Sequence, residues 1–247
     1  MTTIAIQGIR GGCGATSVTA SLSWSLANLG QSVLVIDFSP ANLLRLYFDM
    51  PYSDKRGWII NNIQSDSHNG VINYSERLDY LPLGLLDEKM LSMRVSQLLS
   101  QMSERTSKYP QQLEGLFFEQ YQWILIDASG LYSPLVKLAQ SLADIHLCVL
   151  NPDVACDVLL QQQELPNNSY FLLNRFSPTS LIQQDINHIW QRKVTNLIPI
   201  VLHADEALPE SFAAKKPVGL YQPESLIAQE FNTLAQWCAS FEHQGTH

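Results

Sequence analysis

The chain has 247 residues, of which 46% are hydrophobic and 15% charged, and its formal net charge is −8. This composition allows one large buried core, and an acidic balance without a Lys- or Arg-rich block argues against non-specific binding to DNA or anionic lipid. No apolar run reaches the roughly 18 residues of a membrane span, and the N-terminus lacks a signal-peptide pattern. Neither the cysteines nor the histidines show zinc-ligand spacing. We therefore expect a cytoplasmic protein with reduced thiols.

The first part of the chain alternates between strand and helix patterns. Residues 3–8 (TIAIQG) read as a buried strand, and the apolar spacing of residues 16–30 predicts a helix that Gly30 terminates. Residues 32–37 (SVLVID) are β-branched and apolar on both faces, which is typical of a parallel strand covered on both sides.

Residues 50–115 give a weaker pattern. Residues 78–84 (LDYLPLG) resemble a strand, and residues 88–105 are amphipathic at helical spacing. We expect that helix to pack on the sheet through Met90, Val95, Leu98, Leu99 and Met102.

The second half repeats the strand–helix order. Strands are expected at 122–127, 145–151, 169–174 and 196–202, and helices at 134–143, 154–164, 180–192, 206–214 and 223–241. This order predicts an α/β fold with a doubly wound, mostly parallel sheet flanked by helices. We expect one domain over residues 1–247, with a frayed tail at 240–247.

A glycine-rich stretch, GIRGGCGATS at residues 8–17, joins the first strand to the first helix. Backbone amides at a helix N-terminus favour an anion, and glycines allow phosphate oxygens to come close. Thr16 is then placed to ligate Mg²⁺, and Ser17 to touch the α-phosphate. The residues expected to hold the nucleotide phosphates are Gly11, Gly12, Cys13, Gly14, Ala15, Thr16 and Ser17.

Two carboxylates end predicted strands. Asp37 closes VLVID, and Asp127 closes WILID and begins DASG, which fits a D-x-x-G switch that senses the γ-phosphate. The carboxyl ends of parallel strands meet at one edge of a sheet, so both aspartates should share a crevice with the loop. The alternative is that they serve as helix caps and turn residues.

These motifs carry a resemblance. RGGCGATS resembles the deviant phosphate loop of the MinD/ParA family, K-G-G-x-G-K-[TS], while VLVIDFSP and WILIDASG resemble the next two motifs of that family. The chain is most similar to the branch of cellulose-biosynthesis protein Q (BcsQ), which has R-G-G and lacks the loop lysine. Like that branch, it contains NLLRL, YQWILID and H-x-DEA…AAK-PVG-Y.

The resemblance implies further roles. Asn174 and Arg175 match positions that recognise and stack on adenine, and Pro199 with the loop after it matches the other wall of the base pocket. Asp153 matches a position that reaches the ribose across a dimer interface. The implied cofactors are ATP and Mg²⁺, with the metal held by Thr16, Asp37 and Asp127.

Three departures from the family pattern bear on the chemistry. Ala15 replaces the inner lysine, and losing a charge-assisted hydrogen bond of about 1.5–3 kcal/mol weakens binding unless something compensates. Arg10 replaces the outer lysine, which suggests that it reaches the partner's phosphates in a dimer; a surface salt bridge is the alternative. Ser39 stands where relatives carry an aspartate linked to water activation, so hydrolysis should be very slow or absent.

The resemblance implies an ATP-binding homodimer that regulates or assembles bacterial cellulose secretion. Its partners would be the small cellulose-biosynthesis protein R (BcsR) and other secretion components at the inner membrane, with no nucleic acid and no direct membrane insertion. Three alternatives stay open: a cycling MinD- or ParA-like positioning ATPase, a phosphoryl-transfer or ligase-type enzyme, and a scaffold with an empty pocket. The last predicted helix carries no lysine or arginine, which favours core packing over a lipid anchor.

Overall fold

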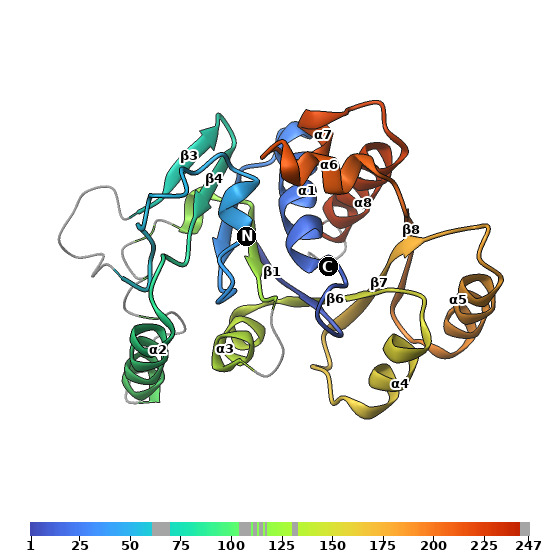
Figure 1. Cartoon of the computed structure of the whole chain (residues 1–247), viewed down its shortest axis with the longest axis horizontal. Coiled ribbons are helices and arrows are strands. Elements are labelled where there is room, and N and C mark those ends of the chain that lie inside the picture. The colour runs from blue at the N-terminus through green and yellow to red at the C-terminus, as the bar shows by residue number, and fades with distance from the viewer. Residues whose placement is uncertain are drawn as a thin grey trace.

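Eight strands form one sheet through the middle of the molecule (Figure 1). The structure is a computed structural model and describes residues 1–60, 70–103, 110, 113, 116, 118–129 and 133–242. The strands are β1 (Thr2–Gly8), β2 (Val33–Asp37), β3 (Ile72–Ser75), β4 (Leu78–Leu81), β5 (Trp123–Asp127), β6 (Ile145–Leu150), β7 (Ser169–Phe176) and β8 (Leu197–His203). Their order is β3-β4-β2-β5-β1-β6-β7-β8, and only the β3–β4 pair is antiparallel.

Helices cover both faces of this sheet. They are α1 (Ala15–Asn28), α2 (Glu88–Ser103), α3 (Pro134–Leu142), α4 (Val154–Gln162), α5 (Leu181–Lys193), α6 (Ala207–Ala213), α7 (Val218–Tyr221) and α8 (Leu226–Glu242), with short 3₁₀ turns at Leu44–Leu46 and Phe118–Gln120. Helices α1, α6, α7 and α8 lie on one face, and α2 to α5 lie on the other (Figure 1). The doubly wound α/β fold expected from the sequence is therefore confirmed.

The agreement extends to individual elements. Every strand and helix expected from the sequence is present, with ends that shift by a few residues. No prediction from the sequence covered strand β3 and helix α7, because a four-residue edge strand and a single helical turn are too short for a clear periodic pattern. The end of the expected helix at 104–105 and the tail at 243–247 lie outside the described residues.

The buried face of α2 differs from the expected stripe. Val95 and Leu98 are 9% and 1% exposed, whereas Met90 and Leu99 are 39% and 37% exposed. Leu91 packs partly buried against the same cluster. Met102 also packs against this cluster. The contact face thus follows positions 91, 95, 98 and 102, so the expected stripe is confirmed at Val95, Leu98 and Met102 and was wrong at Met90 and Leu99.

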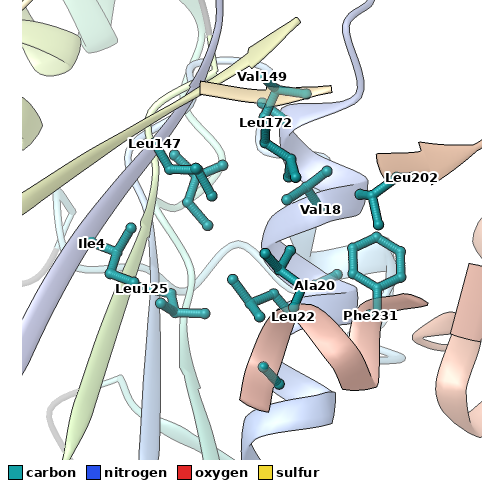
Figure 2. Packing of buried hydrophobic residues seen from close by; sticks show 14 of the residues in the cluster. Ile4, Val18, Ala20, Leu22, Leu125, Leu147, Val149, Leu172, Leu202 and Phe231 are labelled. Carbon is teal, nitrogen blue, oxygen red and sulfur yellow. The ribbon is translucent and has the colours of Figure 1, made fainter. Parts of the chain in front are cut away.

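On the other face, α1 and α8 pack together over the centre of the sheet. Figure 2 shows Val18 and Leu22 of α1 between the strands, which carry Leu125 and Leu147, and Phe231 of α8, all in one buried cluster. Core packing of α8, as the sequence predicted, is confirmed for Ile227, Phe231 and Leu234, which are fully buried, whereas Leu226 at its start is 53% exposed. None of the helices among the described residues is long and apolar enough to cross a membrane.

Candidate functional site

The loop between β1 and α1 has a shape that requires glycine at both ends. A Cβ on Gly8 would lie 2.8 Å from the backbone oxygen of Arg10 and 2.9 Å from the Cβ of Cys13. Gly14 caps α1 at φ 92°, a left-handed conformation that glycine adopts without strain. Because α1 begins directly at Ala15, the free amides of its first turn face the crevice that the loop borders.

Asp37 and Asp127 lie side by side at the ends of β2 and β5, where they are register partners. Both are fully buried. One oxygen of each accepts a backbone N–H two residues further on, from Ser39 at 2.8 Å and from Ser129 at 3.0 Å. The other oxygen of each carboxyl is buried with no hydrogen-bond partner among the described residues.

Burial and mutual repulsion shape the ionisation of this pair. Burial raises the pKa of Asp127 to about 6, against the opposing influence of the Thr16 and Ser129 hydroxyls. Burial, followed by the charge of Asp127, raises the pKa of Asp37 well above its ordinary value. Two buried carboxylates with free oxygens are costly unless a cation joins them, so the pair fits a divalent metal.

The hydroxyls of the helix start lie next to these carboxylates. The Thr16 hydroxyl oxygen is 3.0 Å from that of Ser129, and Ser17 accepts a hydrogen bond from the Tyr47 hydroxyl at 2.8 Å. No group of three or more His, Cys, Asp or Glu side chains that could hold a metal occurs among the described residues. A Mg²⁺ ion here would therefore depend on a hydroxyl, the two carboxylates and the ligand's phosphates.

The loop opens into a cavity of about 300 Å³. Its lining residues are Gly12, Gly14, Ser17, Asn174, Arg175, His203, Ala204, Asp205, Glu206, Leu208 and Pro209. The cavity thus connects the phosphate loop with the end of β7, where the base-recognising residues were expected. Arg175 is exposed there at φ 57°.

Asn174 joins the two parts of this cavity. Its side chain is 1% exposed, and its amide nitrogen donates to the backbone oxygen of Cys13 at 2.8 Å. The amide oxygen has no partner in the described part of the chain. This oxygen is a buried acceptor that a ligand amine can satisfy, which suits the exocyclic amine of adenine.

Pro199 does not line this cavity. It lies within β8, which continues for four more residues to His203, so it sits away from the carboxyl end of the strand. The loop after this strand, which the resemblance gave to the same wall, does line the cavity from His203 to Pro209. A role for Pro199 itself stays a prediction.

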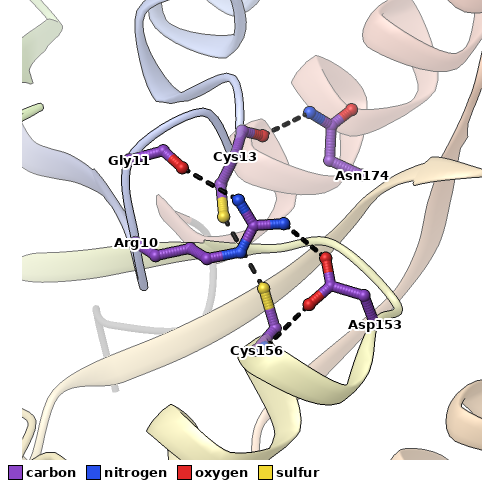
Figure 3. A network of polar contacts seen from close by, with 6 residues as sticks. All are labelled: Arg10, Gly11, Cys13, Asp153, Cys156 and Asn174. Atoms are coloured by element: carbon purple, nitrogen blue, oxygen red, sulfur yellow. Dashed lines mark hydrogen bonds and ion pairs between the residues drawn. The ribbon is translucent and has the colours of Figure 1, made fainter.

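Arg10 and Asp153 contact each other within the one chain. A terminal nitrogen of Arg10 pairs with Asp153, and a second one donates to the backbone oxygen of Gly11 at 2.9 Å (Figure 3). Asp153 also caps α4 by accepting the backbone N–H of Cys156 at 2.8 Å. The salt bridge considered as the alternative for Arg10 is therefore present, and its role across a dimer stays a prediction.

The remaining loop positions have simpler surroundings. Ala15, at the place of the missing lysine, is 5% exposed and packs in the core. Gly11 and Gly12 are exposed, as a loop that closes over a ligand requires. Gly130, the last residue of the D-x-x-G pattern, lies outside the described residues.

The site and the fold now allow comparison with known proteins. The family model described as cellulose biosynthesis protein BcsQ matches residues 1–239. The chain belongs to the BcsQ family. The BcsQ of Escherichia coli K12 is 38% identical over 240 residues, which cover 96% of this chain and 94% of that protein.

Solved structures share the fold of this BcsQ family member. The septum site-determining protein MinD of Pyrococcus horikoshii, complexed with Mg-ADP, superposes with a TM-score of 0.68 at 23% identity and covers 96% of this chain and 95% of that one. Cobyrinic acid a,c-diamide synthase of Mycobacterium smegmatis, with an ATP analogue and magnesium, gives 0.72 at 14% identity over 100% and 96% of the chains. The fold is that of MinD/ParA-type P-loop NTPases, and in these relatives it holds a nucleotide with magnesium.

Some contacts of the site could not be expected from the sequence. Trp58 donates its indole N–H to the backbone oxygen of Asp37 at 2.8 Å, and its ring packs on Phe38 with centroids 4.7 Å apart. His203 pairs with Glu230 of α8 at the edge of the cavity. His203 begins the H-x-DEA motif, but its partner Glu230 and the aromatic Trp58 lie outside the motifs, so local patterns give no signal for these contacts.

Proposed function

We propose that this BcsQ family member binds ATP with Mg²⁺ and acts as a regulatory or assembly component of bacterial cellulose secretion. One observation carries the nucleotide part: two buried carboxylates with unpaired oxygens lie beside a glycine loop at a helix N-terminus. Family membership supports the cellulose part.

Each part of the ligand has a matching group in the cavity. The amides of the loop and of the first turn of α1 receive the phosphates, and Asn174 accepts a hydrogen bond from the base while Arg175 covers it. Mg²⁺ would be held by Thr16, Asp37 and Asp127, and when bound it supplies positive charge that neutralises the phosphates. The metal also removes the repulsion between the two carboxylates.

The same residues support slow or absent hydrolysis. Ala15 offers no ammonium group to a developing phosphate charge. Ser39 is buried, its backbone N–H is used by Asp37, and an unactivated hydroxyl is a poor base near neutral pH. The site is therefore suited to sustained nucleotide binding rather than to rapid turnover.

A homodimer with ATP between the subunits would supply the missing cation. In this proposal Arg10 leaves Asp153 and contacts the phosphates of the partner's nucleotide, and Asp153 reaches the partner's ribose. Both side chains are partly exposed, at 31% and 37%, and so are accessible to a second subunit. Nucleotide binding and dimerisation would then stabilise each other.

The cellular setting follows from the family. We propose a cytoplasmic protein that BcsR and other secretion components recruit to the inner membrane. Packing occupies one side of α8, where Ile227, Phe231 and Leu234 are fully buried, so these side chains are not available to lipid. The net charge of −8 gives little support for DNA as a partner.

Titration calorimetry of the purified protein with ATP and Mg²⁺ tests this function through a pair of glycine variants. Gly14→Ala would place a Cβ 2.6 Å from the Asn174 amide nitrogen, and Gly30→Ala would meet nothing within 4 Å. Both positions have φ near 90°, so the backbone strain is matched, at about 1 kcal/mol. We expect Gly14→Ala to lower ATP affinity at least about tenfold, while Gly30→Ala binds as the wild type does.

Phosphate release measured on the same samples separates this function from its alternative. Wild-type protein without measurable ATP binding would contradict the proposal. Robust hydrolysis that is stimulated by lipid vesicles or DNA and lost in Asp127→Asn would favour the cycling positioning ATPase.

A further inference from the structure

Two thiols that are far apart in the sequence meet behind the phosphate loop. The sulfur atoms of Cys13 and Cys156 are 3.7 Å apart (Figure 3). Cys13 belongs to the loop, and Cys156 lies in the first turn of α4. A disulfide brings two sulfur atoms to about 2.0 Å, so rotation of the side chains and a small shift of the loop can join this pair.

The surroundings divide the pair into a nucleophile and a resolving thiol. The hydrogen bond with Cys156 lowers the pKa of Cys13 to about 6, aided by the backbone and the positive charge of Arg10, while burial opposes. The contact with Cys13, together with burial, raises the pKa of Cys156. The positive charge of Arg10 and the backbone hydrogen bonds thus favour the thiolate, which is the reactive form, on Cys13.

We propose that Cys13 and Cys156 form a reversible disulfide that ties the phosphate loop to α4 and weakens nucleotide binding. The cross-link itself rests on the geometry of the two sulfur atoms, and its effect on the ligand rests on the proposed function. In a reducing compartment such a bond would be transient, as redox-sensing disulfides are.

A peroxide is the oxidant class that this chemistry requires. The Cys13 thiolate attacks one oxygen of hydrogen peroxide, the O–O bond breaks, and water leaves after protonation, so that a sulfenic acid remains on Cys13. The sulfur of Cys156 then attacks the Cys13 sulfur, the S–O bond breaks, and hydroxide takes the Cys156 proton to leave as water. Two thiols and one peroxide thus give one disulfide and two waters.

Both sulfur atoms lie just below the surface. Cys13 and Cys156 are 1% and 0% exposed, but the neighbouring Gly12 and Val154 are exposed, Val154 at 59%. Small movements of a glycine-rich loop are enough to admit a small oxidant.

The loop geometry explains why this bond would affect the ligand. The backbone oxygen of Cys13 accepts the hydrogen bond from Asn174, and the next residues start α1. Contraction of the sulfur contact pulls this backbone toward α4 and fixes it there. The loop amides then lose the freedom to close around phosphates, and the alignment of Asn174 changes with them.

The other two cysteines provide an internal control. Burial raises the pKa of Cys238 to about 12, and burial likewise raises the pKa of Cys148. Cys238 lies on α8, far along the chain from the loop, and is 4% exposed. It should stay a thiol under conditions that oxidise Cys13.

Peroxide treatment of the full-length protein, followed by non-reducing peptide mass mapping, tests the cross-link. We expect a peptide pair that joins Cys13 to Cys156 with the mass of two hydrogens lost, reversed by dithiothreitol. Cys156→Ser should abolish the pair, and Cys238→Ser should leave it unchanged. A model dithiol in the same sample shows when the oxidant is sufficient. The proposal would be overturned if, at that point, Cys13 carries a sulfinic acid or both cysteines are still unmodified thiols.

Redox titration with and without saturating Mg-ATP tests the coupling to the ligand. If the disulfide weakens ATP binding about tenfold, ATP must by linkage stabilise the reduced form and raise the midpoint potential of the pair by about 30 mV. An unchanged potential in protein that binds ATP would overturn the coupling. The mass readout needs no nucleotide, so the two tests can fail separately. If the protein forms the cross-link on oxidation but its reduced form binds no ATP, the disulfide is established and the proposed function and the coupling are contradicted.

Discussion

The buried carboxyl groups of Asp37 and Asp127 lower the stability of the protein when no cation is bound between them. Each carboxyl has one satisfied oxygen and one without a partner in the described residues. The folded chain therefore favours the protonated form of this pair, and a bound metal would favour the ionised form. A binding site that is unfavourable when empty is a common compromise between stability and function.

This pair predicts a pH dependence with a definite sign. Folding raises the pKa of Asp127 from 3.8 to about 6, so between these values the folded protein holds a proton that the unfolded chain has lost. The contribution of Asp127 to stability is therefore greatest below pH 3.8, falls as the pH rises to about 6, and stays low above that. The expected loss is of the order of 1–3 kcal/mol.

Chemical denaturation of wild type and Asp127→Asn across this range measures the effect. The buried His146 opposes it, because burial lowers its pKa to about 4 and its contribution rises with pH over the same window. The difference between the two proteins removes the contribution of His146 and leaves that of the coupled pair of Asp37 and Asp127. We expect the variant to be the more stable one near pH 7 and to lose Mg²⁺-dependent binding of ATP; equal pH slopes in the two proteins would contradict this.

At the scale of elements, helix α2 shows that an amphipathic pattern predicts a helix but does not fix which of its apolar residues are buried. Its sequence offers apolar residues over a broad arc, and the line through Leu91, Val95, Leu98 and Met102 joins the hydrophobic cluster on this side of the sheet. The rotation of the helix about its axis depends on the residues that it packs against. The neighbouring positions Leu98 and Leu99, at 1% and 37% exposure, report on this rotation directly.

Alanine substitutions at these two positions test the orientation of α2. Leu98→Ala removes a buried side chain and should lower the free energy of unfolding by about 2–4 kcal/mol. Leu99→Ala leaves an exposed position and should change it by less than about 1 kcal/mol. Urea denaturation of both variants gives the comparison, and equal losses would show that the helix is rotated differently.

At the scale of the whole molecule, the proposed dimerisation depends on what Arg10 and Asp153 contact in one subunit and in two. The Arg10–Asp153 contact is an ion pair of partly exposed side chains, which is worth little by itself and can be exchanged for a phosphate contact. A bidentate contact between the Arg10 guanidinium and a phosphate would be stronger than the ion pair between Arg10 and Asp153. Assembly can therefore depend on nucleotide without a large rearrangement of the fold.

Light scattering coupled to size-exclusion chromatography tests this dependence. We expect wild-type protein to become dimeric with Mg-ATP, and Arg10→Ala to stay monomeric with ATP affinity reduced about ten- to a hundredfold. Arg56→Ala, which removes another arginine paired with an aspartate at the surface, is the matched control and should dimerise normally. If Arg10→Ala also becomes dimeric at the Mg-ATP concentration that suffices for the wild-type protein, the role given to this residue is contradicted.

The sequence by itself determined the strand–helix alternation, the phosphate-loop position and the family, because these depend on local periodicity, glycine placement and short motifs. It also placed Asp37 and Asp127 at strand ends, and parallel strands bring such ends together. Only the tertiary structure decided that Arg10 pairs with Asp153, that Cys13 meets Cys156, and that the segment from His203 to Pro209 lines the cavity beside Asn174. These contacts join residues far apart in the chain. Their geometry depends on strand length, helix rotation and packing, which no local pattern of residues fixes.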